Sequence, residues 1–208
     1  MKKWMILFMA VLLCGMSVSA LAEDTQLYSR PTEGYSISVP AQWLCVDKSN
    51  LDALIAAYEK GEMTFTGTNA NTLRKIKPQV EGIDCAVLIN PHANNIVITK
   101  EKLGVELTME QFVALVVPTL CSQLQQQLPG LEFTSEGDMV TFGENKFAIL
   151  AGRYGIDDGE ATLEMLYYLD GADLYTLTLT TSSIADQDMV NAFYGEVVAA
   201  CRTFTVAQ

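Results

Sequence analysis

The sequence predicts an α+β domain in which helices pack on the faces of an antiparallel β-sheet. The first observation is a change of hydrophobic period. From Leu131 onwards apolar and polar residues alternate, as in half-buried strands. The second is that short turn sequences separate four such runs, and short turns join antiparallel neighbours. The third is a pair of amphipathic helices, at about 108–128 and 186–202, that flank the runs.

The four runs form a predicted meander of strands at 139–142, 146–154, 160–169 and 174–181. Their connections carry the turn residues Gly143-Glu144-Asn145, Asp157-Asp158-Gly159 and Asp170-Gly171. The helix before the meander begins with a capping box of Thr108 and Gln111. It contains Pro118, which we expect to kink it because the proline ring clashes with the preceding turn.

The N-terminal half carries shorter elements. Residues 35–39 alternate as a strand, which Pro40 ends, and Trp43 after it is expected to plug the end of the sheet. Ser49 or Asn50 caps a short helix that ends at Gly61.

A polar stretch from Thr64 to Thr72 follows and is expected to be a loop. We expect Asn71 to cap one or two helical turns that end before Pro78. Residues 86–89 and 96–98 are predicted strands, joined through Pro91 and Asn94-Asn95.

The first twenty-two residues have the pattern of a signal peptide. Lys2 and Lys3 precede an apolar stretch at 4–13, and Ala20-Leu21-Ala22 supplies the small residues that a signal peptidase requires. We therefore expect export through the secretory pathway, to the outside or the cell envelope, and a mature chain from Glu23. The alternative is an uncleaved N-terminal membrane anchor. Lipidation at Cys14 is disfavoured because the preceding Leu13 is bulky.

Residues 23–208 suit a single domain. The chain has 13 basic and 25 acidic residues, and its net charge is −12. That balance argues against nucleic acid and anionic lipid surfaces as partners, since both require a basic surface. The acidic excess is concentrated in residues 103–208, which carry three basic and fifteen acidic side chains.

The decapeptide from Gly34 to Trp43, GYSISVPAQW, resembles the opening strand of PsbP-like proteins, whose pattern is GYSxxxPxxW. That superfamily includes a Ran-binding nuclear import factor and small bacterial exported proteins. The resemblance implies an α/β/α sandwich from about residue 26 to the C-terminus, with a helical and loop insertion at about 49–81. It also implies a binding or assembly role, and it carries over no functional residue.

Four cysteines remain after export, namely Cys45, Cys85, Cys121 and Cys201. An even number of cysteines outside the cytoplasm is typical of disulfides, and their spacing matches no metal site. Three connectivities are possible, of which we favour Cys45–Cys85 and Cys121–Cys201. The alternative is that these thiols fill the core.

Candidate functional residues are few. Arg74, Lys75 and Lys77 form the one basic cluster, and beside the loop Thr64–Thr72 they are a candidate partner contact. His92 is the only histidine, which excludes a two-histidine metal site. The acids at 157–160 lack the alternating spacing of a calcium loop. No cofactor or metal is predicted.

The sequence therefore favours an exported, non-catalytic binding or assembly-accessory domain that acts at the bacterial cell envelope. We expect the inserted segment Ser49–Glu81 to be its variable contact surface, and deletion of Thr64–Thr72 should leave the fold intact but weaken partner capture. The alternatives are a small secreted hydrolase that uses acidic residues of the C-terminal half, and a purely structural surface protein.

Overall fold

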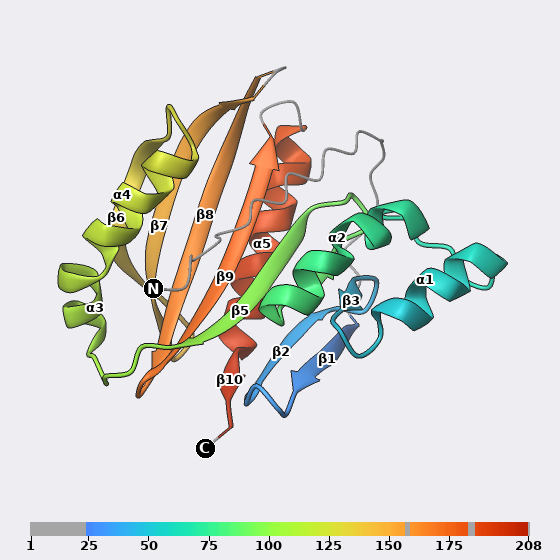
Figure 1. The fold of residues 1–208 in the computed structure, drawn as a ribbon, viewed down its shortest axis with the longest axis horizontal. Helices are drawn as coiled ribbons and strands as arrows, with labels where there is room; N and C mark the ends of the chain where they lie inside the picture. The colour runs from blue at the N-terminus through green and yellow to red at the C-terminus, as the bar shows by residue number, and fades with distance from the viewer. Residues whose placement is uncertain (1–23, 157–158, 183–185, 208) are drawn as a thin grey trace.

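A computed structural model describes residues 24–156, 159–182 and 186–207. Its centre is a seven-stranded antiparallel sheet with the strand order β3-β4-β5-β9-β8-β7-β6 (Figure 1). In that order the strands are β3 (Leu44–Val46), β4 (Ala86–Ile89), β5 (Asn95–Lys102), β9 (Asp173–Ser182), β8 (Gly159–Asp170), β7 (Asn145–Ile156) and β6 (Glu132–Phe142). The four C-terminal strands form the meander that the sequence predicts.

A second, three-stranded antiparallel sheet contains β1 (Thr25–Arg30), β2 (Tyr35–Pro40) and β10 (Thr205–Val206). The strand predicted at 35–39 is β2, which lies at the centre of this sheet. The strands β1, β3 and β10 were not predicted. β3 and β10 have only three and two residues, and β1 buries a tyrosine and an arginine where a pattern search expects aliphatic residues.

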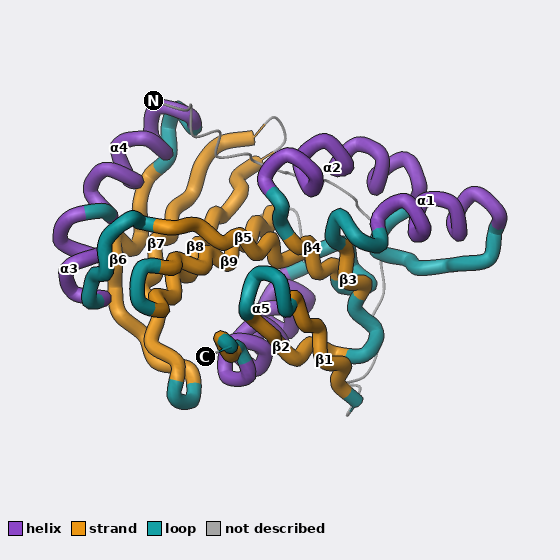
Figure 2. Tube along the Cα trace, turned by 60° about the horizontal axis from the view of Figure 1, so that its bottom comes forward, coloured by secondary structure: helices purple, strands orange, loops and turns teal. Residues whose placement is uncertain are grey.

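One face of the large sheet is covered by α5 (Gln187–Thr203) together with the small sheet (Figure 2). The helix turns Phe193, Val197 and Cys201 to the sheet. Aromatic rings dominate this core, where Phe204 contacts both Tyr35 and Tyr175. The predicted C-terminal amphipathic helix is thus confirmed.

Two helical pairs cover the other face at its two ends. The pair α3 (Met109–Leu115) and α4 (Val117–Gln127) packs on the meander, and the pair α1 (Leu51–Lys60) and α2 (Ala70–Ile83) packs on β3, β4 and β5. The molecule therefore has three layers, which are helices, sheet, and helix with small sheet (Figures 1 and 2). The predicted fold class, an α/β/α sandwich built on an antiparallel meander, is confirmed.

The long helix predicted at about 108–128 is divided into α3 and α4 at Val116. Both hydrogen bonds of the capping box form between Thr108 and Gln111. Pro118 lies in the first turn of α4, where its missing N–H costs no intrahelical bond. The effect of Pro118 is therefore a break between two helices.

The prediction for α2 was wrong at both ends. Asn69 is the N-cap and accepts a hydrogen bond from the Thr72 N–H, whereas Asn71 lies inside the helix. The helix also continues through Pro78 to Ile83. Pro78 is exposed, so water can bind the carbonyl that loses its helical partner, and the buried residues on the other side hold the helix in place. Those residues are Leu73, Ile76 and Val80.

Candidate functional site

The basic cluster predicted as a partner contact lies on α2, but two of its three charges are paired with α1. Arg74 forms an ion pair with Glu59. Lys77 donates to Asp52 at 2.5 Å and lies 3.5 Å from Glu81. These pairs join the two helices across their exposed side, where ion pairs contribute little to stability. Lys75 is exposed and has no ion pair within the described part of the chain.

The loop before α2 is fixed to the turn between β4 and β5. The Thr66 hydroxyl donates to the Pro91 carbonyl at 3.1 Å. Gly67 lies so close to the backbone of Asn90 that an added Cβ would be 2.1 Å from its carbonyl oxygen. Thr68 is buried beside it. Because the loop also supplies the cap of α2, deletion of Thr64–Thr72 would damage the fold, contrary to the sequence-based expectation.

The β4–β5 turn places the half-buried His92 next to this loop. Asn90 is buried, and its Oδ1 accepts hydrogen bonds from the backbone N–H groups of His92 and Asn94, both at 2.9 Å. Ala93 adopts a left-handed conformation with φ of 67°. A side chain in that conformation is strained, so the turn depends on the hydrogen bonds of Asn90.

Trp43 and Glu196 complete the group of residues around Asn90. Trp43 is only 3% exposed and stacks on Phe193 with ring centroids 5.9 Å apart, so the prediction that it belongs to the core is confirmed. Glu196 projects from α5. Burial raises the pKa of its carboxyl above the ordinary value, and the nearby Asn90, Trp43 and His92 offset only part of that effect.

We call Trp43, Thr68, Asn90, His92 and Glu196 the turn cluster. Sequence analysis had singled out Trp43, His92 and the threonine-rich loop separately, and the structure brings them together. It had missed Glu196, because that residue lies more than a hundred positions from the others and no short motif contains it.

The turn cluster offers hydrogen-bonding groups that other described residues do not satisfy. The hydroxyl of Thr68 is buried without a hydrogen-bond partner in the described part of the protein. The indole N–H of Trp43 makes no hydrogen bond of normal geometry there, but it lies close enough to the Glu196 carboxyl to lower the pKa of that group. Buried polar atoms normally have partners, and an exception calls for an explanation. Together with a carboxyl of raised pKa and an imidazole, these groups are suited to holding a polar group of a ligand or partner.

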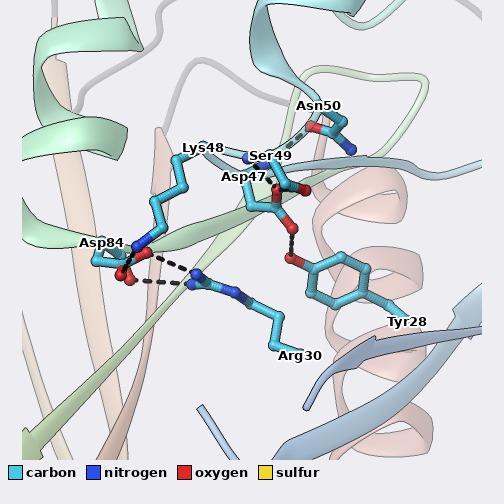
Figure 3. Close-up of polar contacts among 7 residues, drawn as sticks. All are labelled: Tyr28, Arg30, Asp47, Lys48, Ser49, Asn50 and Asp84. Atoms are coloured by element: carbon cyan, nitrogen blue, oxygen red, sulfur yellow. Dashed lines mark hydrogen bonds and ion pairs between the residues drawn. The ribbon is translucent and has the colours of Figure 1, made fainter. Parts of the chain in front are cut away.

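A second polar network joins the small sheet to the α1–α2 pair (Figure 3). Arg30 of β1 donates to the Asp84 carboxylate at 2.6 Å and to its carbonyl at 3.0 Å, and Lys48 pairs with the other carboxylate oxygen. Beside it, the Tyr28 hydroxyl donates to Asp47 at 2.6 Å. Burial opposes ionisation of Asp84, but the bonds from Lys48 and Arg30 hold its pKa below the ordinary value. These contacts hold β1 against the end of α2, and we call the Arg30–Asp84 pair with Lys48 the clamp.

The four cysteines are free thiols in this structure. Cys85, Cys121 and Cys201 are buried and Cys45 is half-buried. Cys45 and Cys201 contact the core under α5, whereas Cys85 lies under α1 and α2 and Cys121 under α3 and α4. The two favoured pairings, Cys45–Cys85 and Cys121–Cys201, would each join residues from different parts of the core, and neither is formed.

The remaining sequence-based sites receive little support. Asp157 and Asp158, at the acidic hairpin tip, lie outside the described residues, as does the predicted signal peptide. The described residues contain no group of three or more His, Cys, Asp or Glu side chains placed to hold a metal ion. None of the described helices is both long and apolar enough to cross a lipid bilayer.

The same layered arrangement is found in a solved PsbP structure. The chain is similar to cyanobacterial PsbP (CyanoP) from Synechocystis sp. PCC 6803, with a TM-score of 0.54 and 15% identity over 92% of this chain and 98% of that one. It also matches LpqN, described as involved in cell envelope biogenesis of Mycobacterium tuberculosis, with a TM-score of 0.45 and 11% identity over 84% and 83% of the two chains. No family model and no curated protein sequence matches it. The PsbP-like fold is therefore shown, and at these identities the likeness concerns the fold alone.

Proposed function

We propose that this protein is an exported, non-catalytic domain that binds a partner, or assists an assembly, at the bacterial cell envelope. The observation that carries this proposal is the turn cluster. Three distant segments meet there around Asn90, the Thr68 hydroxyl is buried without a partner among the described residues, and the Trp43 indole N–H faces the Glu196 carboxyl, whose pKa burial raises. Ligand sites combine a rigid scaffold with a few polar groups placed in this way.

The surface next to the turn cluster suits a macromolecular partner. The loop at 64–69 contains Thr68 and extends beyond the cluster beside the β4–β5 turn, and Lys75 is the one member of the basic cluster on α2 with no ion pair among the described residues. A partner that uses Arg74 or Lys77 would have to displace their pairs with α1. We therefore place the contact at the loop and the β4–β5 turn, with Lys75 as the free basic residue near it in the chain.

Site-specific photo-crosslinking in the native host tests this placement. A photoreactive residue at position 66 or 92 should give a specific adduct with an envelope component. The same residue at position 136, which is exposed on β6 at the other edge of the large sheet, should give none. Adducts from position 136 alone, or none from 66 and 92, would contradict the placement.

A small hydrolase is the second candidate, because burial raises the pKa of three carboxyls, those of Glu101, Glu164 and Glu196. Glycoside hydrolysis needs two carboxyls roughly 5–9 Å apart. Glu101 is the cross-strand neighbour of Leu174, which belongs to the core under α3 and α4. Glu164 is the cross-strand neighbour of Leu179, which belongs to the core under α5. Because cross-strand neighbours share a face of the sheet, Glu101 lies on the opposite face of the large sheet from Glu164. A glycosidase screen of the wild type and of the variants Glu164→Gln and Glu196→Gln tests this candidate. An activity that the wild type shows and both variants lose would support it.

A further inference from the structure

The two sheets have four edge strands, and three of them carry features that prevent pairing with another chain. β3 has three residues and β10 has two, which is too short to offer a template. β6 is long, but its register shifts twice, and it exposes three acids. Those acids are Glu132, Glu136 and Asp138. Short strands, bulges and charges are the usual means by which proteins protect sheet edges.

The fourth edge, β1, lacks this protection. It has six residues and pairs with β2 in continuous register, without a bulge. Its exposed positions are Thr25, Leu27 and Ser29, none of which is charged. Leu27 is 68% exposed. Within the described residues, the backbone of 25–29 makes no hydrogen bond outside the β1–β2 ladder. The outer N–H and C=O groups of this strand therefore have no backbone partner among residues 24–156, 159–182 and 186–207.

We propose that β1 pairs with β1 of a second copy of this chain, in antiparallel orientation, to join two small sheets into one. The exposed residues of β1 are uncharged, so two copies of the strand can lie side by side without like charges opposing each other. When two identical strands pair antiparallel about a two-fold axis, each residue lies opposite one whose side chain is on the same face of the sheet. The axis must therefore pass between the two copies of one residue, which then lie directly opposite each other. An axis at Leu27 places Leu27 opposite Leu27 of the second copy, and Thr25 opposite Ser29.

That register matches apolar with apolar and hydroxyl with hydroxyl along the outer face of the sheet. It covers the large side chain that β1 leaves in water, and it brings five residues of each strand, 25–29, into the ladder. The centre of the six-residue strand lies between Leu27 and Tyr28, and of the axes at these two positions only the one at Leu27 places the exposed leucines opposite each other. Strand addition of this kind draws its affinity from backbone hydrogen bonds and its specificity from alternate side chains.

Sedimentation of the purified protein over a wide concentration range tests the pairing. The account predicts a monomer–dimer equilibrium that Leu27→Lys weakens by about tenfold or more, since two like charges would then face each other on the axis. Leu115→Lys is the matched control, because Leu115 is 66% exposed on α3, away from β1. A wild-type protein that stays monomeric throughout, or equal weakening by both substitutions, would overturn the proposal.

Crosslinking tests the register and does not depend on the stability of either lysine variant. Leu27→Cys should form a disulfide between two copies under mild oxidation. Thr25→Cys should not, because the two positions 25 would lie four residues apart along the pair, about 13 Å, which is beyond the reach of a disulfide. Equal crosslinking at both positions, or none at position 27, would refute this register. The outcome is independent of the proposed site at the turn cluster.

Discussion

Removal of one partner from the Arg30–Asp84 pair should have a cost that depends strongly on which partner is removed. The guanidinium of Arg30 is 5% exposed, whereas the carboxylate of Asp84 is 34% exposed and also pairs with Lys48. Asp84→Asn therefore leaves a buried cation without its directly bonded anion, with only the more distant Asp47 to balance it. Arg30→Met leaves a carboxylate that keeps a second cation and some water.

The expected magnitudes follow from that asymmetry. Breaking a buried pair from one side costs about 3–5 kcal/mol, while replacement by an apolar residue of similar size is often close to neutral. We expect Asp84→Asn to lower the free energy of unfolding by about 3 kcal/mol and Arg30→Met by about 1 kcal/mol. Asparagine suits position 84, because Asp84 has a φ of 52° and asparagine tolerates that conformation.

Urea denaturation of both variants at neutral pH would measure these two costs, provided that the transitions keep the slope of the wild type. A larger loss for Arg30→Met than for Asp84→Asn would refute the reasoning. As pH falls from the ordinary pKa of aspartate through the lowered pKa of Asp84, the difference between wild type and Asp84→Asn should shrink and then disappear, because the Asp84 carboxyl adds stability only while it is ionised in the folded protein.

Three further predictions concern single positions. Burial raises the pKa of the Glu164 carboxyl in the folded protein, so the stability of the wild type should fall as pH rises through this raised pKa. Thermal melts at acidic and alkaline pH should show a smaller fall in stability for Glu164→Gln than for the wild type. Asn69→Ala should cost about 1 kcal/mol of unfolding free energy in urea by removing the cap of α2, whereas Asn71→Ala should change little, and equal effects would contradict the assigned cap. Gly67→Ala should destabilise the protein in the same assay because its Cβ would clash with the Asn90 backbone, whereas Gly195→Ala, which meets nothing within 4 Å, should stabilise α5 by about 0.5–1 kcal/mol.

The sequence predicted the fold best where the hydrophobic period is strong. The last three strands of the meander and α5 have long, regular patterns, and the structure has them within a few residues of the predicted ranges, whereas β6 begins seven residues before the strand predicted at 139–142. The α2 prediction failed because Pro78 was treated as a stop signal, although the buried side of the helix continues beyond it. Local signals such as a proline are overridden when tertiary packing supports the helix.

The candidate site was predictable only in parts. Trp43 and His92 attracted attention as single residues, but nothing in one sequence indicates that they share a neighbour in Asn90 or that Glu196 joins them from α5. The Arg30–Asp84 clamp was missed for the same reason, since its two residues lie far apart in the chain and belong to different elements. Contacts of this kind depend on how the strands pair, which periodicity alone does not determine.

Native mass spectrometry of the protein purified from the exported fraction of its own host tests the central claim most directly. The account predicts a chain that begins at Glu23 and carries a co-purifying mass, which the wild type keeps and Glu196→Gln or His92→Ala loses. A bare chain under conditions that preserve other envelope complexes would contradict the binding role. A chain that keeps residues 1–22 would contradict cleavage of the predicted signal peptide.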